Sequence, residues 1–309
     1  MYITLDGGTT NTRINLFDGT VIDSIKINMG ARLGLTDKLG LYNGIKEAIK
    51  DLLARNNLSE KDIEHIIASG MITSEGGLLK VDHVSAPAGV IELNKGIKIT
   101  KMPEITEIPF AFVPGVRLNG ETYADTDVMR GEETELFGIN ELMGITGEAA
   151  YILPCSHSKL IFTDKNEKIC TFFSALTGEM IAALSSGTIL SANIDLKNAK
   201  VNDLLYEGYS YALENGINKA LFKVRILANF MNGTNDDAYS FFLGIILADE
   251  VEAVKKSSAI NVYIAGRAQI KEAEALLLKR FTDKNVILVP DEYAEIATSV
   301  GMVKVLKTL

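Results

Sequence analysis

Apolar and polar residues alternate along the first 27 positions, and this pattern predicts three short strands joined by tight turns. The first two strands flank a turn that contains Gly7 and Gly8, and residues 21–27 supply the third strand. The next segment, residues 39–56, has apolar side chains at helical spacing. The pattern therefore predicts an antiparallel meander followed by a helix.

A second meander is predicted near the middle of the chain. Strand-like runs at residues 151–153, 159–163 and 168–173 repeat the opening pattern, with a polar turn between the first two runs. A repeat of about half the chain length predicts two copies of one α/β domain that face each other across a cleft. A glycine-containing turn sets the expected boundary between residues 1–146 and residues 147–309.

Helical and strand-like runs fill most of the remaining chain. Apolar spacing predicts helices over residues 128–142, 177–186, 201–215, 219–231, 236–256 and 268–281, and from residue 291 onward. Short strands are predicted at residues 63–68, 110–113, 261–265 and 286–289. Residues 81–107 combine prolines with short apolar runs, and we expect irregular structure there.

Composition narrows the functional classes. The 309 residues are 47% hydrophobic, which is ample for a packed core, and the net charge of −9 disfavours a general nucleic-acid binder or a protein held on an anionic membrane. Two cysteines, Cys155 and Cys170, give no disulfide framework or zinc spacing. The sequence shows neither a leader pattern nor an apolar run of membrane-spanning length. We therefore expect a soluble cytoplasmic protein.

The turn after the first strand carries the clearest chemistry. Gly7 and Gly8 remove Cβ where a backbone would approach an anion closely. Three side chains with hydrogen-bonding groups follow, namely Thr9, Thr10 and Asn11. Asp6 closes the strand with a carboxylate, which would repel a bound phosphate unless a cation such as water-held Mg²⁺ lay between them. The alternative is an ordinary glycine hairpin with threonines on a solvated edge.

Several stretches resemble known ATP-binding enzymes. Residues 6–11 resemble the first phosphate motif of the actin and hexokinase superfamily, and residues 128–138 read VMRGEETELFG, which looks like the signature of the 2-dehydro-3-deoxygalactonokinase family. Further stretches similar to that family are residues 69–72, 153–159, 176–180 and 264–266. Two tryptophans of the family pattern are replaced, by Gly7 and Leu160. The resemblance covers nearly the whole chain.

The resemblance implies a fold and an activity. The fold would consist of two actin/hexokinase (ribonuclease H-like) domains, each a mixed sheet with flanking helices. Residues 1–146 would bind a sugar acid and carry one phosphate hairpin, and residues 147–309 would bind the nucleotide. The activity would be transfer of the γ-phosphate of ATP, with Mg²⁺, to the C6 hydroxyl of 2-dehydro-3-deoxy-D-galactonate. The partner would be this small molecule, with a homodimer as a further expectation.

Two hairpin turns supply the expected phosphate contacts. The candidates are Gly8, Thr9, Thr10, Asn11, Ser156, His157, Ser158 and Lys159, with Gly266 on the adenosine side. Backbone amides and hydroxyls in such turns can bind the β- and γ-phosphates, and a lysine adds a point charge. For Lys159 the alternative is an exposed strand lysine, and for His157 it is a structural hydrogen bond.

The catalytic acid is expected at the start of the helix predicted over residues 128–142. Asp127, Glu132 and Glu133 are candidates for the general base that orients the sugar hydroxyl and accepts its proton. Neighbouring helical side chains diverge by about 100°, so we favour Glu132 and expect Glu133 on the helix flank, facing Arg130 or solvent. Asp6 completes the set as the metal-side carboxylate.

Substrate contacts are expected from two arginines and one loop. Arg130 is the first choice for a substrate carboxylate, because a guanidinium fork binds that group bidentately, with a local ion pair as the alternative. Arg13 is the second choice, although it could pair with Asp6. Ser74 belongs to the polar loop after residues 63–68, a position where ligand crevices form in α/β sheets.

Two other functional classes remain open on the sequence. A polyphosphate or nucleotide phosphohydrolase on the same fold would use a glutamate at the start of this helix to activate water. A nucleotide-binding regulator or filament subunit would bind ATP without turning over a small molecule.

Overall fold

The computed structural model describes residues 1–266 and 268–308, which form two compact units. Unit 1 contains residues 1–147, residues 164–171 and the chain from Asp291 onward, and unit 2 contains Glu148–Thr163 and Phe172–Pro290. The domain boundary predicted between residues 146 and 147 assigns the last helix to the second domain. Its contacts place it in unit 1 instead.

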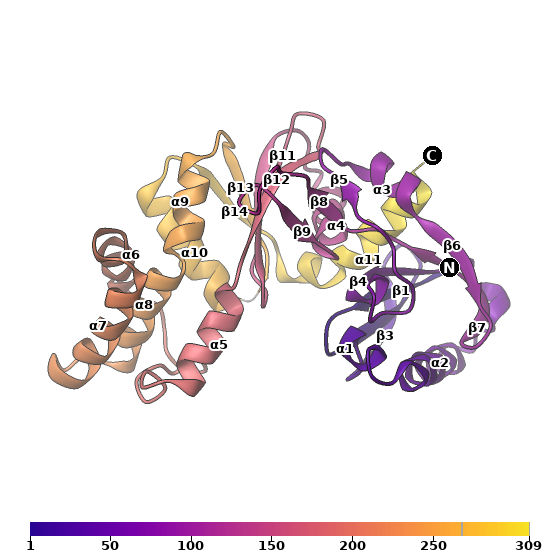
Figure 1. The fold of residues 1–309 in the computed structure, drawn as a ribbon, viewed down its shortest axis with the longest axis horizontal. Coiled ribbons are helices and arrows are strands. Elements are labelled where there is room, and N and C mark those ends of the chain that lie inside the picture. Colours follow the sequence, from indigo (N-terminus) through magenta and orange to yellow (C-terminus); the bar gives the residue numbers. More distant parts are fainter. Residues whose placement is uncertain (267, 309) are drawn as a thin grey trace. The chain divides into compact units, whose positions relative to one another are not determined.

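The central sheet of unit 1 has the strand order β3-β2-β1-β4-β7-β6 (Figure 1). Its strands are β1 (Tyr2–Gly7), β2 (Thr12–Phe17), β3 (Val21–Ile27), β4 (His65–Gly70), β6 (Lys98–Met102) and β7 (Thr106–Phe112). The predicted opening meander is confirmed. In the register of the sheet, Asp6 lies opposite Arg13 on the antiparallel neighbour and opposite Ser69 on the parallel one.

Helices complete unit 1. They are α1 (Ala31–Gly34), α2 (Lys38–Arg55), α3 (Val90–Gly96), α4 (Glu132–Met143) and α11 (Asp291–Lys307), with the short 3₁₀ turns η1 (Glu60–Asp62) and η2 (Met71–Thr73). The backbones of α4 and α11 nearly touch, because a Cβ added at Gly138 would lie 1.8 Å from the Ala297 carbonyl oxygen. Glycine at this crossing lets the last helix pack into unit 1.

Two predictions for unit 1 were wrong. Residues 81–107 are regular rather than irregular, because they contain β5 (Val84–Ser85), α3 and β6. The helix expected from residue 128 starts at Glu132, because β9 (Asp127–Met129) pairs with β8 (Val116–Leu118) and Gly131 turns the chain at φ +115°. That conformation is open to glycine and strained for other residues.

Unit 2 is built on a sheet with the order β12-β11-β10-β13-β14. The strands are β10 (Ala149–Leu153), β11 (Ser158–Thr163), β12 (Ile169–Ala175), β13 (Asn261–Ile264) and β14 (Asn285–Leu288). The second predicted meander is confirmed, and β12 runs from residues of unit 1 into unit 2. The helix α5 (Thr177–Gly187) follows it.

The helices of unit 2 lie around α8, which packs against α6, α7 and α9 (Figure 1). They are α6 (Leu204–Asn215), α7 (Ile217–Phe230), α8 (Asn235–Ile246), α9 (Ala248–Lys256) and α10 (Ala268–Phe281). The single helix predicted over residues 236–256 was wrong, since the chain breaks at Leu247. Every residue from Ala238 to Ile246 is buried, so the break leaves no mark in the apolar pattern. Within the described chain, no helix has the length and apolar character needed to cross a membrane.

Candidate active site

The turn between β1 and β2 is held from one side by backbone hydrogen bonds. The Gly8 amide donates to the Asn11 carbonyl at 2.8 Å, and the carbonyls of Gly8 and Thr9 accept from the first residues of α1. The side chains of Thr9 and Thr10 remain exposed, and Asn11 donates to the Thr10 hydroxyl at 3.0 Å. Backbone hydrogen bonds from α1 thus order the turn, and the side chains of Thr9 and Thr10 are left exposed.

The structure gives a packing reason for glycine at position 7, whereas the sequence suggested close approach of the backbone to an anion. A Cβ at this buried position would lie 2.4 Å from the Cβ of Ile72 in η2. Glycine is therefore required for packing of η2 against β1, rather than for approach to an anion. At Gly8 the nearest obstacle to a Cβ is the Asn11 carbonyl oxygen at 3.2 Å.

Asp6 lies at the edge of a small cavity of about 180 Å³ in unit 1. Arg13, Asn15, Glu135, Glu295 and Ser299 are among its lining residues. Burial raises the pKa of Asp6 above its ordinary value, the Arg13 charge partly offsets this rise, and the Glu132 charge adds to it. A carboxylate in this environment is stabilised by any additional cation.

Glu132 and Glu135 lie on one face of α4, three residues apart, and both act electrostatically on Asp6 or are acted on by it. Burial, then the charges of Glu132 and Asp6, raises the pKa of Glu135 to about 8. Asp6, Glu132 and Glu135 therefore form one group, which we call the acidic cluster. Sequence analysis missed Glu135, although its helical spacing from Glu132 was a usable signal.

Glu133 is fully buried, so the expectation that it could face solvent was wrong, whereas its charge does interact with that of Arg130, the other expected partner. The Gly131 amide donates to both of its carboxyl oxygens, at 2.8 and 2.9 Å, and the Ser69 hydroxyl lies 3.4 Å from one of them. Burial, then the Glu132 charge, raises the pKa of Glu133 to about 8. Its side chain turns back over the first turn of α4 and acts as a structural cap.

Asp127 and Ser74 make local contacts. The Asp127 carboxylate accepts from the Val128 amide at 2.7 Å within β9, outside α4. The Ser74 hydroxyl donates to the Met71 carbonyl at 2.6 Å and closes the end of η2. The described hydrogen bonds of Asp127 and Ser74 stay within their own segments and do not connect them to the acidic cluster.

The guanidinium of Arg130 is engaged by the protein itself. One terminal nitrogen donates to the Thr73 carbonyl at 3.0 Å and to the Thr73 hydroxyl, and the other donates to the Val81 carbonyl at 2.8 Å and contacts the His83 ring. This arrangement does not support the expected bidentate role toward a substrate. Arg13, by contrast, is exposed and lines the cavity beside Asp6.

The contact between His83 and Arg130 predicts acid sensitivity. The pKa of His83 is lowered to about 4, chiefly by burial and to a smaller extent by the charges of Arg130 and Arg117. The unfolded chain binds this proton near pH 6.5 and the folded chain does not, so stability should fall as the pH drops below 6.5. We expect His83→Asn to lose less stability than the wild-type chain between pH 7 and pH 5, by on the order of 1 kcal/mol in urea unfolding. Equal losses in both proteins would contradict this assignment.

In unit 2, the turn between β10 and β11 exposes Ser156 and His157. The His157 ring lies 2.9 Å from the Glu179 carboxylate, which is the structural contact that the sequence allowed. Ser158 is buried and donates to Glu250 at 2.9 Å, and Lys159 is only 5% exposed rather than a surface lysine. Ser156 and His157 are thus accessible on this hairpin, whereas Ser158 and Lys159 are buried.

Gly266 lies beside this second hairpin. It has φ +87°, and a Cβ there would lie 2.8 Å from the Pro154 carbonyl oxygen. The neighbouring Ala265 amide donates to the Ile152 carbonyl at 3.0 Å, which holds the loop after β13 against β10. The sequence-predicted adenosine-side glycine and the predicted phosphate turn are therefore adjacent within unit 2.

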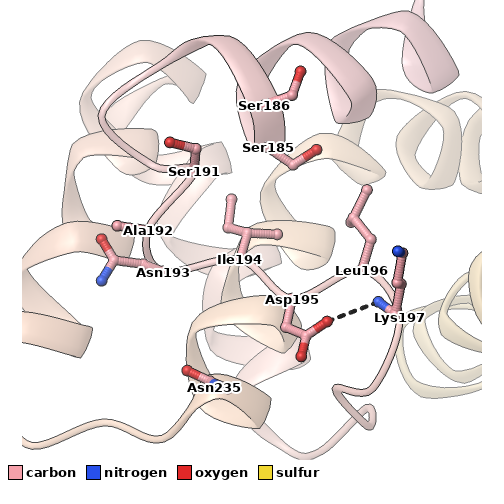
Figure 2. A pocket seen from close by; sticks show the side chains of 10 residues that line it. All are labelled: Ser185, Ser186, Ser191, Ala192, Asn193, Ile194, Asp195, Leu196, Lys197 and Asn235. Carbon is pink, nitrogen blue, oxygen red and sulfur yellow. Dashed lines mark hydrogen bonds between the residues drawn. The ribbon is translucent and has the colours of Figure 1, made fainter.

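A larger cavity of about 460 Å³ lies near the C-terminal end of α5 (Figure 2). Figure 2 shows Ser185 and Ser186 on the helix, Asn193 and Asp195 on the following loop, and Asn235 at the start of α8. Ser185 and Ser186 both donate to the Ala182 carbonyl, and Asp195 accepts from the Lys197 amide at 2.9 Å. None of the residues predicted for catalysis or phosphate binding lines this cavity.

Comparison with known proteins places these features in a family. The chain matches the model of the 2-keto-3-deoxy-galactonokinase family over residues 6–303. It is 25% identical over 261 residues to the Escherichia coli (strain K12) 2-dehydro-3-deoxygalactonokinase, which covers 82% of this chain and 80% of that protein. The family match spans the acidic cluster and both hairpin turns.

Solved structures support the same fold. A Sinorhizobium meliloti protein named as a candidate 2-dehydro-3-deoxygalactonokinase superposes with a TM-score of 0.77 at 20% identity, over 100% of this chain and 98% of that one. Component A of the Acidaminococcus fermentans (R)-2-hydroxyglutaryl-CoA dehydratase superposes with a TM-score of 0.52 at 12% identity, over 99% of both chains. The expected actin/hexokinase-like α/β fold class is confirmed, and the chain belongs to the 2-keto-3-deoxy-galactonokinase family.

Proposed function

We propose that this protein transfers the γ-phosphate of MgATP to the C6 hydroxyl of 2-dehydro-3-deoxy-D-galactonate. The use of ATP and of a small-molecule acceptor follows from membership of the kinase family. The observation that carries the proposal is the acidic cluster, which joins Asp6 after the first hairpin strand to Glu132 and Glu135 on α4, inside the family match. Phosphoryl transfer asks mainly for positioning and charge stabilisation around such groups.

Within the cluster we propose different roles for the acids. Glu132 is the general base toward the sugar hydroxyl, since it is partly exposed and its charge acts on Asp6, while one of its oxygens accepts from the Arg130 amide at 2.9 Å. Glu133 is structural, because it is fully buried against the Gly131 amide, and Asp127 is structural because it lies on β9, outside α4. Arg13 replaces Arg130 as the group for the substrate carboxylate, because the fork of Arg130 is already bonded to backbone carbonyls.

We propose that unit 1 binds the sugar acid and unit 2 binds the nucleotide. The exposed Thr9 and Thr10, with Asn11 and the Gly8 backbone, are suited to phosphate oxygens. In unit 2 the corresponding groups are Ser156 and the turn backbone, with Gly266 on the adenosine side. Ser158 and Lys159 are buried and act through the shape of this turn, and the exposed His157 is held by its contact with Glu179.

The acidic cluster also fits Mg²⁺. The charge of Glu132 raises the pKa of Asp6, and the charges of Glu132 and Asp6 raise the pKa of Glu135. A divalent cation would relieve this repulsion, and carboxylate oxygens and water are the ligands that Mg²⁺ prefers. Asp6 would hold the ion, through water. Bound there, Mg²⁺ would neutralise charge on the transferred phosphoryl group. Among the described residues, no group of three or more His, Cys, Asp or Glu side chains has the geometry of a direct metal cage.

A coupled assay of ADP release tests the proposed function. With MgATP, we expect turnover to require 2-dehydro-3-deoxy-D-galactonate and to yield its 6-phosphate, identified by phosphorus NMR. The panel should include other 2-keto-3-deoxy sugar acids, because the acceptor is the part of the proposal that the family resemblance alone supplies. ADP formed equally fast without any sugar acid would favour a phosphohydrolase, and nucleotide binding without turnover would favour a regulator.

Two sequence expectations stay predictions within this proposal. Cytoplasmic location would be tested by cell fractionation, and the homodimer by sedimentation velocity with and without ATP. A concentration-independent monomer would remove the dimer and leave the proposed chemistry unchanged.

A further inference from the structure

Two glutamates are buried together in unit 2, outside every site predicted from the sequence. Glu250 belongs to the first turn of α9 and is 1% exposed, and Glu274 belongs to α10 and is 0% exposed. Burial of carboxyl groups is costly unless hydrogen bonds and shared protons compensate it. Specific hydrogen bonds are therefore needed to stabilise this pair.

Glu250 is the hydrogen-bond acceptor of two different elements. Its Oε2 accepts from the Ser158 hydroxyl at 2.9 Å, and its Oε1 accepts from the Thr177 hydroxyl. Ser158 is the first residue of β11, directly after the phosphate turn, and Thr177 is the first residue of α5. One carboxylate thus connects the exit of the turn to the start of a helix.

The turn and the first turn of α5 are in direct contact. The Glu179 amide donates to the Ser156 carbonyl at 3.1 Å, and a Cβ at Gly178 would lie 2.2 Å from the Cys155 carbonyl oxygen. A shift of α5 would therefore shift the exposed residues of the turn. Since Glu250 holds Thr177 and Ser158 at once, its carboxylate sets the position of the turn relative to α5.

Glu274 is the buried acid that interacts with the Glu250 carboxylate. Both oxygens of Glu274 are buried, and neither has a hydrogen-bond partner among the residues that the structure describes. Burial, then the charge of Glu250, raises the pKa of Glu274 well above its ordinary value. Two carboxylates cannot form a hydrogen bond without a proton, and Glu250 already accepts with both oxygens. A proton on Glu274 would satisfy the pair, with Glu274 as the donor and Glu250 as the acceptor.

We propose that Glu250 and Glu274 are positioning residues, which act through Ser158 and Thr177 to hold the second phosphate turn in its ATP-binding shape. The inference rests on the proposed kinase function. It adds residues that make no contact with ATP themselves. A charged acceptor suits this role because hydrogen bonds to an ionised group are shorter and stronger than those between neutral groups.

The main test compares the same change at two glutamates of α9. Glu250→Gln keeps the size of the side chain but removes one of its two acceptors, and we expect the KM for ATP to rise on the order of 10-fold, with the KM for the sugar acid unchanged. Glu252→Gln is the matched control, because Glu252 bonds to the Tyr209 hydroxyl at 2.6 Å and not to the turn. Its KM for ATP should stay within about twofold of wild type. An unchanged KM for ATP in folded Glu250→Gln would overturn the inference.

Three further variants guard against a purely structural effect. Thr177→Val removes one donor at constant shape, and we expect roughly a threefold rise in the KM for ATP. Glu274→Gln can still donate to Glu250 and should behave as wild type, whereas Glu274→Met cannot donate and should resemble Glu250→Gln. Equal defects in Glu274→Gln and Glu274→Met would contradict the donor role.

A binding measurement separates this inference from the proposed function. Calorimetric titration with MgADP reports nucleotide affinity without any sugar acid, and circular dichroism reports folding of each variant. If the wild-type chain binds MgADP but phosphorylates no sugar acid, the proposed function fails while the comparison of Glu250→Gln with Glu252→Gln still decides the inference. If both variants bind MgADP equally well, the inference fails while the kinase assay stands.

Discussion

Replacing Asp6 by asparagine is expected to lower kcat for sugar-acid phosphorylation by about 100-fold or more and to leave the protein folded. Asp6 closes β1 beside the exposed phosphate turn and belongs to the acidic cluster, so its loss removes the charged anchor for a cation. Burial raises the pKa of Asp6, which means that the folded chain disfavours its charge. A neutral asparagine should therefore not lower the melting temperature.

The control for this variant is Asp18→Asn. Asp18 is an exposed residue of the next turn, so the same chemical change should alter neither kcat nor the melting temperature. Turnover of Asp6→Asn within about twofold of wild type, in a folded protein, would exclude Asp6 from the site. A selective loss of MgATP-dependent turnover, partly restored at higher Mg²⁺, would support its role next to the metal.

The acids at the start of α4 should separate in kinetics. We expect Glu132→Gln to lose about 10²- to 10⁴-fold in kcat, the usual contribution of a general base, with the melting temperature nearly unchanged. Glu135→Gln should also lose kcat, because Glu135 lies three residues away on the same face and interacts with Asp6. Glu133→Gln and Asp127→Asn should keep kcat, because Glu133 is fully buried against the Gly131 amide and Asp127 lies on β9, outside α4.

Stability against pH supplies the second half of this comparison. The pKa of Glu133 is raised to about 8 in the folded chain, so the folded state holds a proton that the unfolded state releases near pH 4.5. Stability should therefore decrease as the pH rises from about 4.5 to 8, and Glu133→Gln should weaken this decrease. If Asp127→Asn proves kinetically dead while Glu132→Gln is active, the assignment of the base is wrong, although the kinase function survives.

The hairpins illustrate what local patterns can predict. Alternating apolar residues on both sides of a glycine turn place strands at β1 and β2, because successive side chains of a strand point to opposite faces of the sheet. The polar turn residues stand between those strands whatever the rest of the chain does. For that reason Thr9 and Thr10 were assigned correctly to an exposed turn, and Ser156 likewise.

The α4 region illustrates where local patterns fail. The neighbouring acids Glu132 and Glu133 look equivalent in sequence, yet Glu133 is fully buried against the Gly131 amide, while Glu132 is partly exposed and its charge acts on Asp6. The guanidinium of Arg130 donates to the backbone carbonyls of Thr73 and Val81, which lie more than 40 positions away along the chain. Which hydrogen bonds an arginine or glutamate makes depends on elements that meet only after folding.

The sequence by itself determined the order of the two meanders, the glycine turns and the family signature, because these depend on side-chain spacing within a few residues. Tertiary structure alone decided that the last helix joins unit 1, that Glu135 completes the acidic cluster and that Glu250 and Glu274 share a buried site. In each of these cases the decisive quantity is burial or the field of a distant charge. Both arise from packing between segments far apart in the chain, so no local pattern records them.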